Sequence, residues 1–337
     1  MQAAEAVIEH PGQPLFHSLA GTPHAPHAPS RSVDLLNRIA RSWSHRAQVK
    51  KNEPDTLIDA GTDLPEFLEH LLPFHEHPRY QALDTDTKMR ILSCGWIIYN
   101  EKTVAIELDI VSPVCQDILY DNVPGLDNEL SKEIVCETLV DEAYHLLLVK
   151  NANRITRQRR QLEHIRIPQF ALVRQMREEQ DRHMPSWAGL LVRLSTAVVS
   201  EIFISDYLHQ LSEETSIQPL NRATVAAHRH DELAHSKIFS ELTRNFYHAL
   251  GSTQKGFFAS MLPKSIHWFA DQELDLWLDV LQQLGVPGAQ AMVEECRELN
   301  RVALDRLDYS GVVKLASEVG ILDSAEGHAA FRNARLI

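Results

Sequence analysis

The chain twice places a glutamate and a histidine three residues apart, in Asp141-Glu142-Ala143-Tyr144-His145 and in His228-Arg229-His230-Asp231-Glu232-Leu233-Ala234-His235. An α-helix turns about 100° per residue, so Glu142 and His145 lie roughly 60° apart on one helix face. His228, Glu232 and His235 fall within a similar arc. Each cluster therefore directs its acid and imidazole groups towards one point, which predicts two helices that share one metal centre.

A carboxylate-bridged two-metal site in a helical bundle needs one more glutamate from each of two other helices. Glu107 and Glu201 are the candidates, because each lies in a long apolar run. An unpaired buried charge there would cost on the order of several kcal/mol, which a metal ion removes. The alternatives are that Glu107 is a surface acid on an amphipathic helix, and that Glu201 is a buried acid that is either protonated or hydrogen-bonded to the hydroxyl of Ser200 or Ser205. Glu101 competes with Glu107, but it would face about 120° away and lies beside polar neighbours.

Helical periodicity dominates from residue 33 onward, and strand-like alternation is scarce. The predicted fold is all-α: a ferritin-like four-helix bundle with additional flanking helices and a carboxylate-bridged dimetal centre in the bundle core. Further helices are expected at 33–49 and at 255–284. The four bundle helices are expected at 85–111, 127–155, 186–211 and 218–250.

Residues 1–32 carry five prolines among glycine, serine and histidine, which predicts a flexible N-terminal arm. Residues 33–337 are expected to form a single helical domain. A net charge of −13 argues against nucleic acid or an anionic membrane as the main partner. No segment reaches the roughly 18 uninterrupted apolar residues of a membrane span, and the N-terminus lacks the pattern of a signal peptide. We therefore expect a cytoplasmic protein.

The expected metal ligands are Glu107, Glu142, His145, Glu201, His228, Glu232 and His235. His228 lies one turn before Glu232 and adds a third imidazole, whereas His230 would point about 200° away. Asp141 and Asp231 are candidates to accept the outer ring N–H of a ligand histidine and so fix its tautomer. Four carboxylates balance two divalent ions, and oxygen and nitrogen donors without thiolate favour iron or manganese.

These features resemble the AurF-like diiron N-oxygenases, a family whose namesake oxidises 4-aminobenzoate. The resemblance implies two iron ions, dioxygen and an external electron donor that together convert a primary amine to a hydroxylamine and onward to oxime, nitroso or nitro products. It also implies a homodimer. Beyond the ligands it includes Pro73-Phe74-His75-Glu76-His77-Pro78, Tyr99-Asn100-Glu101, Ile217-Gln218-Pro219, Phe269-Ala270-Asp271-Gln272 and Ser310-Gly311.

The candidate substrate pocket departs from the family pattern at two positions. Leu307, beside Arg306, stands where the family namesake has an arginine for the arylcarboxylate, and Ser205 replaces an asparagine. Tyr99 is the remaining candidate pocket residue. A buried pocket without a partner for the carboxylate binds a free benzoate poorly. The expected substrate is therefore an amino acid or an aminoacyl group on a carrier protein, or an arylamine other than free 4-aminobenzoate.

The segment 150–182 contains nine basic and four acidic residues, an excess of five positive charges in an acidic protein. It is a candidate docking surface for an acidic carrier protein, although a solvated helix end and loop explains the same charges.

Two other functions remain open. A diiron site also suits a carbon hydroxylase or desaturase, although His228 and the family resemblance favour nitrogen. A ferritin-like iron-handling protein is the third reading, and the length of the chain argues against it.

Overall fold

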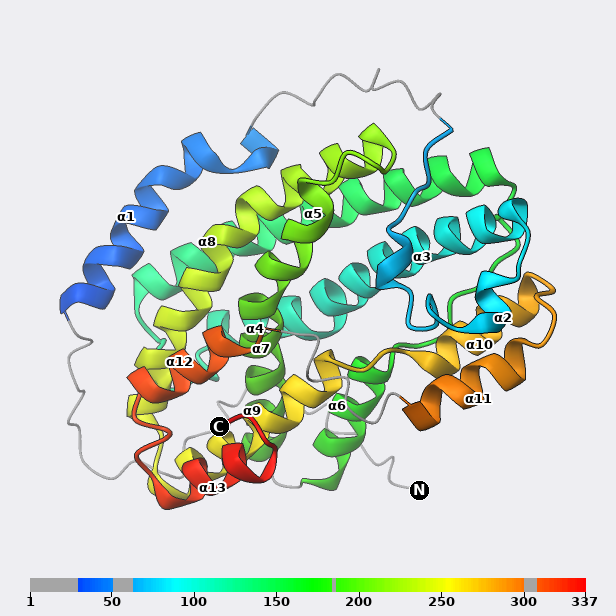
Figure 1. Cartoon of the computed structure of the whole chain (residues 1–337). Coiled ribbons are helices and arrows are strands. Elements are labelled where there is room, and N and C mark those ends of the chain that lie inside the picture. Colours follow the sequence, from blue (N-terminus) through cyan, green and yellow to red (C-terminus); the bar gives the residue numbers. More distant parts are fainter. Residues whose placement is uncertain (1–29, 51–62, 184–185, 300–307) are drawn as a thin grey trace, which may run out of the picture.

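The structure, a computed structural model, describes residues 30–50, 63–183, 186–299 and 308–337. These residues form helices and connecting loops without a strand, which confirms the all-α prediction. In the bundle, α7 packs along α8, α3 along α5, and α5 along α8 (Figure 1). The four bundle helices are α3 (Thr85–Ile106), α5 (Glu129–Arg160), α7 (Ser186–Ser212) and α8 (Pro219–Ala249).

Smaller elements surround this bundle. The helix α1 packs against both α5 and α8, while α9 packs against α7 and α13. Their bounds are α1 (Ser30–Arg46), η2 (Gln48–Lys50), η3 (Glu69–Leu71), α2 (Pro78–Gln81), η4 (Glu107–Val111), α4 (Ser112–Leu119), α6 (Ala171–Arg182), α9 (Ser252–Phe269), α10 (Leu274–Gln283), α11 (Ala289–Leu299), α12 (Ser310–Glu318) and α13 (Ala325–Asn333). The first helix begins at Ser30, so the last three residues of the expected N-terminal arm are helical; residues 1–29 lie outside the described part of the chain.

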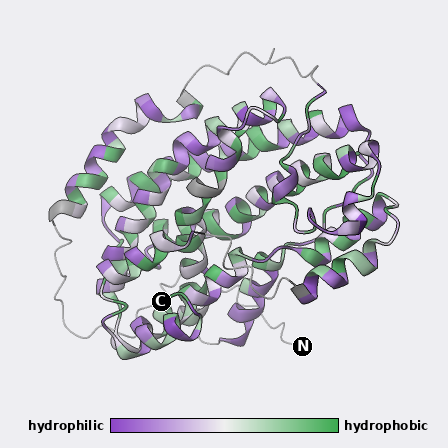
Figure 2. Ribbon diagram, in the orientation of Figure 1, coloured by the Kyte–Doolittle hydropathy of each residue, from purple (hydrophilic) through white to green (hydrophobic). Residues whose placement is uncertain are grey.

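Local sequence explains where the first hairpin begins and ends. Asp84 accepts a hydrogen bond from the backbone N–H of Thr87 at 2.9 Å and starts α3. Asn128 does the same for the N–H of Ser131 at 3.0 Å and starts α5, because a short polar side chain satisfies a free donor of the first turn. α5 ends where Gln161 adopts a left-handed φ of 56°. Figure 2 shows hydrophilic and hydrophobic residues alternating along the helices, as expected when each helix buries one face.

The helix α7 is the most apolar of the four. Its stretch Trp187–Ser212 is long and apolar enough to cross a membrane, with a mean hydropathy of 1.5, but most of it is buried inside the protein. It packs against both α8 and α9. Its apolar residues therefore belong to the protein core.

The prediction of a single helix at 255–284 is wrong, because the helix is interrupted between the end of α9 and the start of α10. Asp271 accepts a hydrogen bond from the backbone N–H of Glu273 at 2.7 Å, and Glu273 adopts a left-handed φ of 55°. The Glu273 carboxylate also accepts the backbone N–H of Ala171 at 2.8 Å. Local side-chain bonds of this kind compete with the helical hydrogen bonds, and the bond to Ala171 joins residues about a hundred positions apart, so the sequence pattern does not reveal it.

The helix expected at 85–111 changes character at its end. α3 gives way at Glu107 to the π-helix η4, which leads directly into α4, so the helical path continues to Leu119. A π-turn inserts one extra residue into a helical turn, and such turns occur frequently at functional sites. In this chain the turn begins at the first of the candidate ligands.

Candidate metal centre

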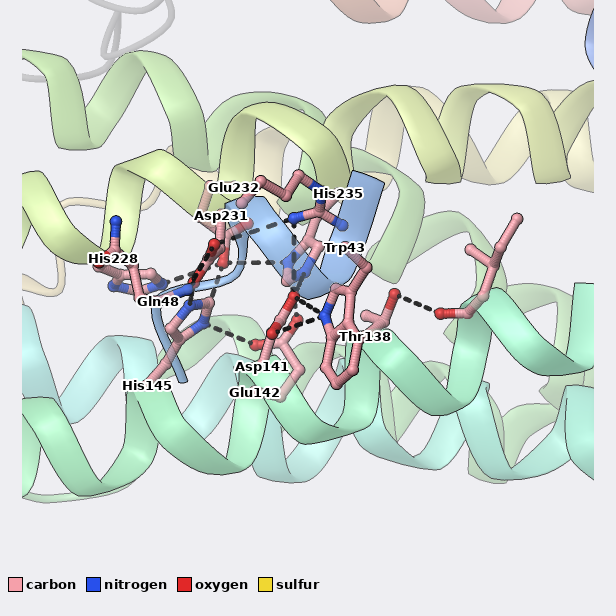
Figure 3. Close-up of polar contacts among 12 residues, drawn as sticks. Trp43, Gln48, Thr138, Asp141, Glu142, His145, His228, Asp231, Glu232 and His235 are labelled. Carbon is pink, nitrogen blue, oxygen red and sulfur yellow. Dashed lines mark hydrogen bonds and ion pairs between the residues drawn. The ribbon is translucent and has the colours of Figure 1, made fainter. Parts of the chain in front are cut away.

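The four bundle helices bring all seven candidate ligands together in the middle of the bundle. Every one of these side chains is at most 3% exposed. Figure 3 shows the α5 and α8 residues of this group facing one another. Glu107 comes from the start of η4, Glu142 and His145 from α5, Glu201 from α7, and His228, Glu232 and His235 from α8.

Six of the seven side chains form two overlapping groups, and within each group the potential ligand atoms all lie within 4.8 Å of one another. The seventh, Glu201, belongs to neither group, and its Oε2 lies 3.9 Å from Nδ1 of His235. One group is Glu107, His145, His228 and Glu232; the other is Glu142, His145, Glu232 and His235. A single oxygen, Oε1 of Glu232, lies 3.0 to 3.4 Å from nitrogens of all three histidines. Shared carboxylates of this kind are what two neighbouring ions need as bridges.

Several polar atoms in this buried cluster lack a hydrogen-bond partner within the described residues. They are both carboxylate oxygens of Glu107, one oxygen each of Glu142, Glu201 and Glu232, and Nδ1 of His235. Buried carboxylates without donors are costly, and buried charges are normally paired or bound to metals. Oxygen and imidazole donors without thiolate also suit iron or manganese. The residues present therefore fit a dimetal centre.

The carboxylates of the cluster shift the pKa values of its histidines. Burial alone would lower the pKa of His145, but hydrogen bonds to Asp231, Glu107, Glu142 and Glu232 outweigh it and raise that pKa well above its usual value. The pKa values of the other two candidate ligand histidines rise for similar reasons. A metal competes with protons for these imidazoles, so its affinity is expected to fall as the pH falls.

Two buried aspartates hold the outer nitrogens of two ligand histidines. Nε2 of His235 lies 3.3 Å from Oδ2 of Asp141, and Nε2 of His145 lies 3.4 Å from Oδ2 of Asp231. Each aspartate thus contacts the histidine of the opposite helix. This arrangement leaves Nδ1 of both rings directed at the carboxylate cluster, as the candidate tautomer-fixing role requires.

Two acid or histidine residues near the candidate ligands in the sequence, Glu101 and His230, lie outside the cluster. Glu101 accepts hydrogen bonds from Lys150 at 2.7 Å and Asn153 at 3.0 Å, so its carboxylate is already satisfied outside the cluster. His230 is exposed on the surface of α8. The choice of Glu107 over Glu101, and of His228 over His230, agrees with these positions.

The N-terminal helix α1 contributes to the centre in a way that the sequence did not predict. Trp43 and Arg46 of α1, and the backbone of Gln48 just after it, contact the two buried aspartates. The sequence predicted a helix here, but α1 is about a hundred residues from its partner in α5. Nothing in the local pattern of residues 33–49 indicates which buried acids the helix meets.

A cavity of about 210 Å³ is lined mainly by α3 and by the connection between α9 and α10, and none of the seven candidate ligands is among its described lining residues. Thr103 lines it one turn before Glu107, and Ile204 lines it one turn after Glu201, so its wall continues the faces that carry two candidate ligands. Tyr99 also lines it, as expected. Of the other candidate pocket residues, Arg306, Leu307 and the side chain of Ser205 lie outside the described part of the structure.

One lysine brings positive charge to this cavity. Among the described lining residues Lys102 is the only lysine or arginine. Its ammonium donates a hydrogen bond to the backbone carbonyl of Phe269 at 3.2 Å and lies 3.7 Å from the carboxylate of Glu273. The charge of Lys102 is therefore partly neutralised within the cavity wall.

Gly95 lets the Phe67 ring pack closely against α3, and replacing it by alanine is expected to destabilise the protein by about 1–3 kcal/mol. A Cβ at this position would lie 2.8 Å from Cδ1 of Phe67, so the ring would have to move. Gly256→Ala is the matched control, because nothing lies within 4 Å of its Cβ position. Denaturant unfolding of both variants checks the expectation; equal stabilities would show that the Phe67 ring yields without cost.

An all-α bundle with carboxylate and histidine side chains from four helices at its centre is typical of the ferritin-like dimetal proteins. Within that class the comparison with known proteins is specific. Residues 29–320 match the model of the AurF family, p-aminobenzoate N-oxygenase AurF, and the chain belongs to this family. It is 30% identical over 295 residues to the 4-aminobenzoate N-oxygenase of Streptomyces thioluteus, with 86% of this chain and 88% of that protein covered. The family consists of diiron N-oxygenases, so this chain is an oxidoreductase of that kind.

Proposed function

We propose that the seven clustered residues bind two iron ions and that the protein oxygenates a primary amine of a natural-product precursor. The balanced first step is RNH2 + O2 + 2 electrons + 2 protons, giving RNHOH and water. An external donor supplies the electrons, and further rounds would lead to oxime, nitroso or nitro products. The observation that carries this proposal is the buried cluster of carboxylates and histidines, in which several carboxylate oxygens lack a hydrogen-bond partner among the described residues.

The protein's own groups have separate tasks in this scheme. When bound, two ferrous ions supply electrons to dioxygen and activate it beside the substrate nitrogen. The seven ligands position the ions, and Asp141 and Asp231 orient two of the imidazoles. Apolar cavity residues such as Ile106 and Ile204 exclude bulk water. The cavity would hold the amine next to the cluster, which converts the oxidation into a reaction between pre-positioned partners.

The charges of the cavity favour a substrate without a free carboxylate. Lys102 already has Glu273 and a backbone carbonyl as partners, and the sequence has Leu307 at the position of the arginine in the family pattern. We therefore propose an aminoacyl group, an amino acid or an arylamine other than free 4-aminobenzoate as the substrate. The expected result is a higher kcat/KM for 4-aminobenzamide than for 4-aminobenzoate. A preference for the acid would contradict this choice of substrate, but not N-oxygenation itself.

Delivery of the substrate by an acidic carrier protein is the second part of the substrate proposal. Three cations of the basic segment are paired with acids outside it, Lys150 with Glu101, Arg160 with Glu66 and Arg177 with Asp109. This pairing reduces the charge that is free for docking. Comparison of a carrier-bound aminoacyl thioester with the corresponding free amino acid separates the two routes; equal kcat/KM values would exclude a carrier.

Product analysis tests the proposed reaction against its alternatives. With a panel of amines, a reductant and oxygen, we expect a mass gain of one oxygen and a changed ¹⁵N chemical shift in labelled product. Hydroxyl groups or double bonds on carbon with unchanged nitrogen would instead show a carbon hydroxylase or desaturase. Uptake of many more than two irons per chain would indicate an iron-handling protein. The proposal also includes a cytoplasmic location and a homodimeric state. Size determination of the purified protein checks the homodimer.

A further inference from the structure

The segment from α1 to η2 makes direct contact with both buried aspartates that hold ligand histidines. The indole Nε1 of Trp43 donates to the two carboxylate oxygens of Asp141 at 3.0 and 3.1 Å. The backbone N–H of Gln48 donates to the two oxygens of Asp231 at 3.2 and 3.1 Å. Figure 3 shows Trp43 and Gln48 reaching these acids from the blue ribbon of the N-terminal segment. One short segment thus binds both halves of the centre.

Arg46 adds a charge between the two contacts. Its NH1 atom lies 3.8 Å from an oxygen of Asp141 and 3.8 Å from an oxygen of Asp231. Its guanidinium nitrogens are buried and make no hydrogen bond within the described residues. Arg46 therefore acts on the two acids through its charge. Both acids are fully buried, where the attraction between charges is stronger than in water.

The two aspartates in turn contact two of the proposed metal ligands, His235 and His145. Asp141 accepts from His235 and Asp231 accepts from His145, so the orientation of each aspartate determines how well it holds the histidine N–H. A displaced aspartate would release the ring to rotate. Trp43 and Gln48 fix the orientation of the aspartates, and the positive charge of Arg46 attracts both carboxylates.

We propose that Trp43 and Arg46 are positioning residues of the metal centre, which set its metal affinity through Asp141 and Asp231. The segment α1–η2 would thus be part of the site, although it supplies no ligand. The inference rests on the metal site of the proposed function. A purely structural role for α1 is the competing explanation, because Leu36 and Ile39 also pack it into the core.

The test measures cobaltous ion affinity and the visible ligand-field spectrum of the cobalt-loaded full-length protein. Trp43→Phe and Arg46→Gln are expected to weaken cobalt binding about tenfold, towards the lower end of outer-sphere effects, and to shift the spectrum. Arg46→Lys should retain most of the affinity, because it keeps the charge. Arg41→Gln, on the exposed side of the same helix, is the matched control and should change neither quantity.

A double-mutant cycle separates positioning from packing. If Trp43 acts through Asp141, then Trp43→Phe should have little further effect on cobalt affinity in an Asp141→Asn background. A fall in melting temperature with unchanged affinity and spectrum would overturn the inference while leaving the metal site intact. Additive losses in the cycle would overturn it as well. Absence of cobalt binding by the unaltered protein would overturn both this inference and the proposed metal site.

Discussion

Replacing His228 by alanine is expected to lower iron occupancy and to reduce turnover by about 100-fold or more, while leaving the helical fold intact. Nε2 of His228 lies 3.3 Å from Glu107 and 3.0 Å from Glu232. Its removal takes one nitrogen donor from the cluster and leaves two carboxylates with one partner fewer. Iron content per chain, turnover and circular dichroism check the three parts of this expectation.

His230→Ala is the matched control for this substitution. It lies two residues away on the same helix, but its side chain is exposed. We expect wild-type iron content and activity from this variant. Unchanged iron content and activity in His228→Ala would remove His228 from the ligand set, and equal losses in the two variants would point to a general disturbance of α8.

Replacing Glu201 by glutamine is expected to abolish iron-dependent activity and yet to stabilise the iron-free protein at neutral and alkaline pH. Burial raises the pKa of Glu201 well above its usual value, and repulsion from Glu232 and Glu142 raises it further. Glutamine has a similar shape and no charge, so it removes the desolvation cost and the repulsion that an ionised carboxylate meets at this position. Opposite effects on stability and activity are typical of a functional group rather than a structural one.

The pH dependence of this effect follows from the direction of the pKa shift. The folded protein holds the Glu201 proton more tightly than the unfolded chain, whose pKa is near the ordinary value of 4.5. The stability that Glu201 contributes is therefore complete below that pH and is lost as the pH rises towards the folded-state pKa. Glutamine has no proton to lose. The melting temperature of iron-free Glu201→Gln should thus match the wild type near pH 4 and exceed it increasingly at higher pH.

Glu101→Gln provides the control for the glutamine substitution. Its carboxylate already accepts hydrogen bonds from Lys150 and Asn153, so the neutral side chain should leave stability unchanged or slightly lower. Iron binding should be unaffected. A melting temperature of iron-free Glu201→Gln below that of the wild type at pH 8 would contradict the account of an uncompensated acid.

The bundle and the cluster could be predicted from the sequence because their signals are local and repeated. Glu142 and His145 share a helix face through their spacing alone, and Glu107 and Glu201 are recognisable as acids inside apolar runs. Helical spacing also predicted that His228 shares the face of Glu232 and that His230 points away from it. Such features depend on residues within a few turns of each other, which is the distance over which helical periodicity carries information.

The features that could not be predicted depend on contacts between distant segments. The break at Glu273 requires the backbone of Ala171, and the role of Trp43 requires Asp141 from α5. The π-helix at Glu107 has no signal in the pattern of apolar residues. These three features lie around the centre and the cavity, where contacts made by the functional site override the local conformational preference of the chain.

Single turnover with isotopically labelled oxygen tests the central claim most directly. The protein is loaded with two ferrous ions per chain and mixed with ¹⁸O2 and a ¹⁵N-labelled amine, and the product is analysed by mass and nitrogen chemical shift. The account predicts one ¹⁸O atom bound to nitrogen, in proportion to the iron loaded, and none in the iron-free protein. Label on carbon alone, or the same yield from protein without iron, would contradict it.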